Sequence, residues 1–149
     1  MLKNYGFLDH GARIVDFSSQ YHHNSGVQNV ILPDHSICWF TSVYVPLPQY
    51  AIVDLGQPIL LSRIGIFLHG ENNQNPSRIG FACGDTQDCS QPLLTTDLEY
   101  RGGDHLWDIP PTVARYVRYT ILDNFGGSGA YTTNLQLYGK PADQTHTEE

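Results

Sequence analysis

The sequence has few cationic residues and no long apolar run. Eight Lys and Arg residues against fifteen Asp and Glu residues leave a formal net charge of −7 at pH 7. Neutralising phosphates requires clustered Lys and Arg, and anionic lipid surfaces attract polybasic segments. Because no stretch approaches the length of a membrane span either, we expect no nucleic-acid partner and no membrane insertion. We expect any other partner to be recognised by shape, by uncharged polar contacts or by local basic spots.

Amphipathic helical patterns with caps are also lacking, and only residues 25–32 predict a single helical turn. Short segments rich in β-branched and aromatic residues, bounded by Gly, Pro, Asn or Asp, instead predict strands. These segments are residues 12–17, 49–55, 61–68, 77–83, 114–122 and 133–139. In the last one, Leu135 and Leu137 alternate with Gln136 and Tyr138, as expected for a half-buried strand.

Many short strands separated by turn residues predict an all-β fold, a jelly-roll β-sandwich. A chain of 149 residues with 40% hydrophobic residues is enough for one folded domain. We therefore expect a single domain over residues 1–140, followed by a polar tail over residues 141–149. The segment 102–111, with its Gly and Pro residues, is expected to be a surface loop.

The chain contains three cysteines. Cys83 and Cys89 flank a short turn-like segment, so they either form a small disulfide loop or remain as two free thiols. Cys38 has no partner in either case. An odd number of cysteines indicates a reducing compartment, and the first residues match neither a signal peptide nor a transit peptide. Both features favour a cytoplasmic location.

No pattern of catalytic or metal-binding residues stands out. His22 and His23 are adjacent, and on an extended segment they would point to opposite sides, so they would not chelate one ion together. Asp104, His105 and Asp108 lie close in sequence, but no nucleophile motif such as G-x-S-x-G accompanies them. We therefore expect no catalytic residue, no metal site and no enzyme.

A resemblance to a known family lies in three segments. They are "FSSQYHHNSGVQNVILPDHSICW" (17–39), "YAIVDLGQPILLSRIGI" (50–66) and "ARYVRYTILDNFGGSGAYTTNLQLYG" (114–139). In this order and spacing they resemble the discoidin domain, also called the coagulation factor 5/8 C-type or galactose-binding-like domain, over roughly residues 12–140. The resemblance implies a jelly-roll β-sandwich that binds other molecules without catalysis.

The secreted members of this family usually join their two ends with a disulfide, and no cysteine stands at either position here. In this respect the chain is similar to intracellular members such as the small intraflagellar-transport subunit of this fold. That resemblance extends to "YVPLPQYAIVDL" (44–55) and "YVRYTILDNFGGSGAYTTNL" (116–135). It implies a cytoplasmic location, with the cilium or the cytoskeleton as the assembly served.

The same resemblance implies calcium in the loop between Asn29 and Trp39. However, the family's Asp, Gly and Thr positions hold Leu32, Pro33 and Ile37. Calcium takes six or more oxygen ligands, and without those side chains only backbone carbonyls would remain. We therefore expect no cofactor, and calcium stays a weak alternative.

The resemblance also places the candidate ligand-binding or partner-binding residues on loops at one end of the barrel. These residues are Tyr21, His22, His23, Tyr44, Leu47, Asn72, Asn73 and Arg78. The two histidines either contact a ligand or are solvated, and Tyr44 and Leu47 either form a protein interface or cover the barrel mouth. The segment 70–78 either binds sugar hydroxyls or forms a turn, and the turn is favoured because Asn, Gly and Pro are turn residues.

Two further expectations concern the end of the chain. Arg115 and Arg118 lie three positions apart on a strand, so one of them faces the barrel interior, where the family motif suggests a pair with Asp54. The glycine-rich segment 123–131 lacks the Lys-Ser/Thr of a phosphate loop. We expect it to be a mobile hairpin loop, with Phe125 closing the barrel end.

Two functions remain open. The main hypothesis is a protein-interaction subunit of a larger intracellular assembly, with a larger protein as its partner. The alternative is a lectin-like module that recognises galactose-type sugars through the histidines and the amide-rich loop. Fold alone does not decide between them, because one fold serves many unrelated binding functions.

Overall fold

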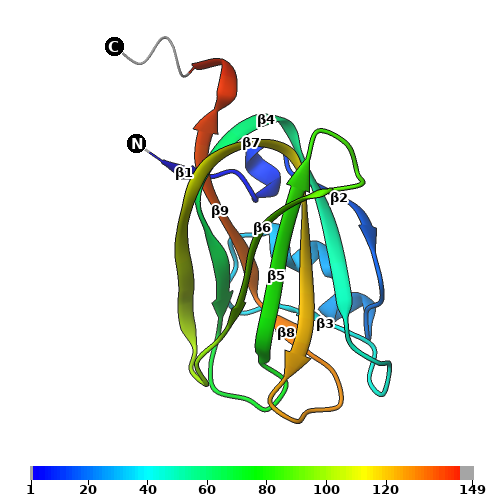
Figure 1. Ribbon diagram of the computed structural model, residues 1–149. Coiled ribbons are helices and arrows are strands. Elements are labelled where there is room, and N and C mark those ends of the chain that lie inside the picture. Colours follow the sequence, from blue (N-terminus) through cyan, green and yellow to red (C-terminus); the bar gives the residue numbers. More distant parts are fainter. Residues whose placement is uncertain (1, 145–149) are drawn as a thin grey trace.

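The computed structural model describes residues 2–144 and forms an antiparallel β-sandwich (Figure 1). The strands are β1 (Lys3–Asn4), β2 (Arg13–Phe17), β3 (Trp39–Phe40), β4 (Gln49–Leu68), β5 (Pro76–Gly84), β6 (Gln91–Asp97), β7 (Gly103–Asn124), β8 (Tyr131–Thr132) and β9 (Asn134–Pro141). The 3-10 helices are η1 (Leu8–His10), η2 (His23–Ser25), η3 (Val27–Ile31) and η4 (Ala142–Gln144). The fold expected from the strand pattern is therefore confirmed. No helix within residues 2–144 is long and apolar enough to cross a membrane.

One large sheet runs in the order β1-β9-β4-β7-β5-β6, with β2 added to β4, and β3 pairs with β8 separately. The strands β4 and β7 are long and bent. The first part of β4 pairs with β2 and with the second part of β7, whereas its second part pairs with β9 and with the first part of β7. Both strands arch over one end of the molecule in Figure 1, which produces the two layers of the sandwich.

The bend in β4 lies at Gly56, where the register with β7 shifts. Gly56 has φ +84°, and a Cβ there would lie 2.9 Å from the carbonyl oxygen of Gly11. Glycine is the residue that adopts such a conformation without a steric penalty. Pro110 and Pro111 of β7 lie at a second register shift, opposite residues 61–63 of β4, and their missing N–H groups interrupt the ladder there.

The core lies between the layers and is built from alternating strand residues. Ile64 and Ile66 of β4 are paired with Leu137 and Leu135 of β9, and these four residues are essentially inaccessible to solvent, as is Leu68. Leu135 and Leu137 enter the core as predicted, but Gln136 on the other face is only 5% exposed, so the strand is not half-buried. Such close packing fixes the strand ends and so positions the loops that leave them.

Several local predictions are wrong. The segment 103–111 is not a surface loop but the first half of β7, and the strands expected at 49–55 and 61–68 are one bent strand. Strand β6 carries no strand-like pattern strong enough to predict. The turn predicted in 25–32 is present as η2 and η3. The first residue of the expected tail, Pro141, ends β9, residues 142–144 form η4, and residues 145–149 lie outside the described residues.

Candidate functional site

Three loops meet at the end of the sandwich opposite the chain termini (Figure 1). Residues 41–48 join β3 to β4, residues 69–75 join β4 to β5, and residues 125–130 join β7 to β8. Backbone hydrogen bonds join them directly, from Tyr44 N to Ser128 O at 2.7 Å and from Gly127 N to Asn73 O at 3.0 Å. The three loops therefore form one continuous surface.

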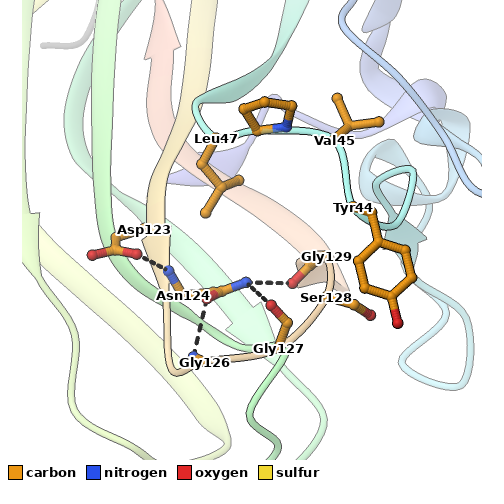
Figure 2. A pocket seen from close by; sticks show the side chains of 10 residues that line it. Tyr44, Val45, Leu47, Asp123, Asn124, Gly126, Gly127, Ser128 and Gly129 are labelled. Atoms are coloured by element: carbon orange, nitrogen blue, oxygen red, sulfur yellow. Dashed lines mark hydrogen bonds between the residues drawn. The ribbon is translucent and has the colours of Figure 1, made fainter.

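Asn124 holds the glycine-rich loop from within. Its Nδ2 donates to the carbonyl oxygens of Gly127 at 3.0 Å and Gly129 at 2.7 Å, and its Oδ1 accepts from Gly126 N at 3.0 Å (Figure 2). Bonds between one side chain and several backbone groups are how Asn stabilises turns. The expectation that this loop is mobile disagrees with these contacts.

Gln74 holds the same loop from the neighbouring segment. Its Oε1 accepts from Gly129 N at 2.8 Å, and its Nε2 donates to Ser128 Oγ at 3.2 Å. A Cβ at Gly127 would overlap Gln74 Oε1 and lie 2.9 Å from the carbonyl oxygen of Asn73. The loops approach one another closely because residue 127 has no side chain.

Tyr44 and Leu47 have different roles. Tyr44 is 88% exposed and has φ +60°, a conformation that is uncommon outside glycine. Leu47 packs partly against the core and points toward Asn124 at the end of β7 (Figure 2). The interpretation that both residues cover the barrel mouth is therefore wrong for Tyr44 and correct for Leu47.

A cleft of about 650 Å³ lies between the loop of residues 41–48 and the glycine-rich loop of residues 125–130. It is lined by Tyr44, Val45, Pro46, Leu47, Asp123, Asn124, Gly126, Gly127, Ser128 and Gly129. In Figure 2, Asp123 and Tyr44 lie at opposite ends of the cleft. The Asp123 carboxylate accepts one hydrogen bond, from Asn124 N at 2.9 Å, and it is the single charged side chain of the lining. The cleft therefore offers acceptors for hydroxyl groups and no cation for an anionic ligand.

Tyr21 belongs to a row of aromatic rings beside the cleft. Its ring centroid lies 5.3 Å from that of Phe40, which lies 4.7 Å from Tyr131, which in turn lies 5.9 Å from His69. Tyr21 is 58% exposed at the end of this row. Tilted rings at these distances attract one another, so the row supports an exposed aromatic surface next to the loops.

The two neighbouring histidines lie together, and the expectation that they point to opposite sides is wrong. The ring centroids of His22 and His23 are 4.3 Å apart, because His22 ends the extended segment and His23 begins η2. His22 Nδ1 accepts weakly from Asn24 N at 3.3 Å. No group of three or more His, Cys, Asp or Glu side chains in residues 2–144 could hold a metal ion.

The amide-rich segment forms a turn, as favoured from the sequence. Asn72 Oδ1 accepts from Gln74 N at 2.8 Å, and Asn72 O accepts from Asn75 N at 2.9 Å. Asn73 contributes its carbonyl to the glycine-rich loop. Arg78 lies not on a loop but on β5, where it pairs with Asp97 of β6 at 2.6 Å. The structure therefore does not bring Arg78 into the cleft.

The loop suggested for calcium has its one nearby carboxylate already in use. Asp34 Oδ1 accepts from the backbone N of Ser36 at 2.8 Å and from its hydroxyl at 2.6 Å. These bonds lower the pKa of Asp34. His35 stacks on Phe67 with ring centroids 3.7 Å apart. These side chains do not form an oxygen-rich cage of the kind that calcium needs.

The predicted pair of Arg115 with Asp54 is confirmed. Arg115 Nε and Nη2 donate to the two carboxylate oxygens of Asp54 at 3.0 and 3.2 Å, and this contact lowers the pKa of Asp54. However, the side chain of Arg115 is 43% exposed, so the pair lies near the surface and not in the barrel interior. Arg118 instead donates to the backbone carbonyls of Asp88 and Cys89.

The acidic and histidine cluster around His105 does not form a reactive site. His105 is buried, its Nε2 lies 3.0 Å from the carbonyl oxygen of Arg101, and burial lowers its pKa. Asp104 and Asp108 are exposed and lie on the other face of β7.

Two further sequence predictions concern the cysteines and Phe125. All three cysteines are free, which agrees with the alternative of free thiols at Cys83 and Cys89. Phe125 is half-buried, with its ring centroid 5.0 Å from that of Tyr100.

Sequence analysis predicted Tyr44 and Leu47 but missed Asp123, Asn124 and Gln74. Asn124 holds the glycine-rich loop that directly follows it, whereas Gln74 contacts that loop from a segment distant along the chain. One signal was available: an Asn followed closely by two glycines is typical of a side chain that stabilises a turn. The role of Gln74 has no signal in a single sequence, because its partners lie 54 and 55 residues away.

Comparison with known proteins shows the fold. The structure is similar to the family 32 carbohydrate-binding module of NanJ from Clostridium perfringens in complex with galactose, with a TM-score of 0.78, 16% identity, and 93% of this chain and 99% of that chain covered. It is similar to a module from a family 31 glycoside hydrolase of the same organism, with a TM-score of 0.76, 18% identity, and 87% and 91% covered.

A third similar structure, from C. perfringens, is a family 32 module in complex with GalNAc-β-1,3-galactose, with a TM-score of 0.75, 18% identity, and 85% and 94% covered. No family model matches the sequence, and no curated protein matches it significantly. The similar structures are binding modules, some of them parts of glycoside hydrolases. The chain therefore has the galactose-binding-like fold of carbohydrate-binding modules.

Proposed function

We propose that this domain binds a neutral carbohydrate in the cleft between the loop that carries Tyr44 and the glycine-rich loop 126–129. The observation that carries the proposal is the lining of that cleft. An exposed aromatic ring stands at one end and a carboxylate at the other, with no cation between them. This favours the alternative that the sequence left open over the protein-interaction hypothesis.

The chemistry of a sugar matches these groups. One face of a pyranose carries C–H groups that pack against an aromatic ring, and its hydroxyls donate hydrogen bonds to carboxylate and carbonyl oxygens. The backbone of residues 126–129 is held in place by Asn124 and Gln74 before any ligand arrives. A preformed site loses less entropy on binding. The galactose and GalNAc-β-1,3-galactose bound to two similar structures support sugars of this type.

Isothermal titration of the full chain with galactose tests the proposal. We expect saturable binding that Asp123→Asn weakens about tenfold, because the variant removes a charge-assisted hydrogen bond. Tyr44→Ala is expected to weaken it as well. Asp85→Asn is the matched control, since Asp85 is an exposed carboxylate in the loop between β5 and β6. Equal effects of the two Asp variants, or no binding of galactose or lactose by the unmodified chain, would contradict the proposal.

A second function rests on the exposure of Tyr44 and Val45, which are 88% and 41% exposed on adjacent positions of one loop. Exposed aromatic and aliphatic side chains on a fixed loop suit burial in a protein interface. On this proposal the chain is a subunit of a larger cytoplasmic assembly of the cilium or the cytoskeleton. Native mass spectrometry of the gently purified protein distinguishes the two: a stoichiometric complex lost in Tyr44→Ala supports the interface, and a lone monomer contradicts it.

A further inference from the structure

A second groove lies on the outer face of the large sheet and shares no lining residue with the cleft. Its volume is about 630 Å³, close to that of the cleft. It is lined by Leu2, Ser62, Arg63, Leu106, Asp108 and Tyr138. Tyr138, Arg63 and Asp108 form one row across β9, β4 and β7, because Arg63 is directly opposite both of the others.

The ion pair in this row leaves groups available for a ligand. Arg63 Nε donates to Asp108 Oδ1 at 2.9 Å, and the two side chains remain 50% and 78% exposed. Within residues 2–144 the terminal nitrogens of Arg63 donate no hydrogen bond, and Asp108 Oδ2 accepts none. A guanidinium and a carboxylate side by side can therefore donate to one hydroxyl and accept from its neighbour.

The tyrosine of the row is held by a buried polar network. Tyr138 Oη donates to Gln136 Oε1 at 2.8 Å, and Gln136 Nε2 donates to Asp104 Oδ1 at 3.1 Å and to Asn134 Oδ1 at 3.2 Å. Gln136 is only 5% exposed and Asn134 is fully buried. Polar groups at such depth fix the orientation of the ring that they contact. The Tyr138 ring is therefore held in position beside Arg63.

We propose that this sheet-face groove is a second carbohydrate site, one that binds a pyranose with two neighbouring hydroxyls. The sugar ring packs on Tyr138 and Leu106, and its hydroxyls contact Arg63 and Asp108. The row carries one positive and one negative charge, with a further carboxylate at Asp104, so a neutral ligand fits it better than an anion. The site is independent of the cleft, because no side chain serves both.

Nuclear magnetic resonance of the ¹⁵N-labelled full chain tests the second site separately from the first. D-glucose, D-galactose, D-mannose, D-xylose and N-acetyl-D-glucosamine are added singly. With at least one sugar we expect saturable shifts of the amide signals of Arg63, Leu106, Asp108 and Tyr138, with a dissociation constant of their own. If the groove amides shift with a sugar and no cleft amide shifts with any of the sugars, the first proposal is refuted and this one stands.

Two variants define the role of the row. Arg63→Met keeps the apolar stem but removes the donors, and it is expected to weaken the groove signal about tenfold. Tyr138→Phe keeps the ring and is expected to retain most of the affinity. Arg78→Met is the matched control, because the Arg78–Asp97 pair has nearly the same exposure, 48% and 77%. An equal response of Arg63→Met and Arg78→Met, or no saturable shift with any of the sugars, overturns the proposal.

Discussion

The substitution Gln74→Ala tests whether the glycine-rich loop is held in place by its neighbour. Gln74 Oε1 accepts from Gly129 N at 2.8 Å, and Nε2 donates to Ser128 Oγ at 3.2 Å. Alanine removes both bonds. The backbone contacts of the segment, from Gly127 N to Asn73 O and from Tyr131 N to Gln74 O, do not need the side chain and remain. The variant should therefore loosen the loop without unfolding the domain.

The size of the effect follows from the two bonds lost. A hydrogen bond contributes about 1 kcal/mol net. Ser128 is half-buried, so water replaces part of what is lost there, whereas Gly129 is buried and its N–H would lose its partner more fully. We expect local opening of the loop to become easier by roughly 1–2 kcal/mol, which corresponds to about a 5- to 30-fold loss of amide protection. The melting temperature should fall by only a few degrees.

Hydrogen exchange measured amide by amide is the appropriate assay, since it separates the loop from the core. The amide of Gly129 should exchange faster in Gln74→Ala, whereas those of β9 should not change. Gln74→Glu keeps an acceptor for Gly129 N and should retain most of the protection, and Gln57→Ala controls for loss of an exposed glutamine elsewhere. Unchanged exchange at Gly129 in the alanine variant would refute the role assigned to Gln74.

Other predictions concern the core, the pH dependence and the thiols. Tyr119→Phe leaves the buried hydroxyl of Thr132 without its 2.7 Å partner, so urea unfolding should show a loss of about 1–3 kcal/mol. Arg115 lowers the pKa of Asp54 in the folded state, so their pairing stabilises the protein above the unfolded pKa and is lost as the pH falls below about 4. Unfolding free energies of Arg115→Gln should therefore vary less with pH in that range, and an unaltered profile would contradict this. Cys38 is half-buried and the other two thiols are buried, so mass spectrometry should find iodoacetamide on Cys38 first.

The β-sandwich itself was predictable because its strands carry local signals. Alternation such as Leu135 and Leu137 against Gln136 marks the face that enters the core. The pairing of Arg115 with Asp54 was also predictable, but only through the resemblance to the discoidin family. The partly exposed position of this ion pair was not predictable, because strand alternation fails where β4 and β7 bend and their register shifts.

The first half of β7 was not predictable from local pattern. Pro110 and Pro111 indicate an interruption, and here they lie within the bend of one strand instead of at the end of a loop. Trp107 and Ile109 carry the apolar alternation, but the charged residues around them are also typical of a loop. Pairing with the second half of β4 decides the outcome, and that pairing joins residues about forty positions apart. Tertiary contacts of this range outweigh local propensity.

The two proposed sites differ in what determines their shape, and this difference determines how each would respond to mutation. The cleft depends on loops joined by single side chains such as Asn124 and Gln74, so one substitution can change its form while the core stays intact. The groove depends on a row across three paired strands, where Arg63, Asp108 and Tyr138 keep their spacing as long as the sheet exists. Substitutions in the groove should therefore remove individual ligand contacts and leave its geometry unchanged. A domain with both sites would bind two sugars of one glycan, or two glycans, and the overall affinity would rise without any new contact if both were engaged at once.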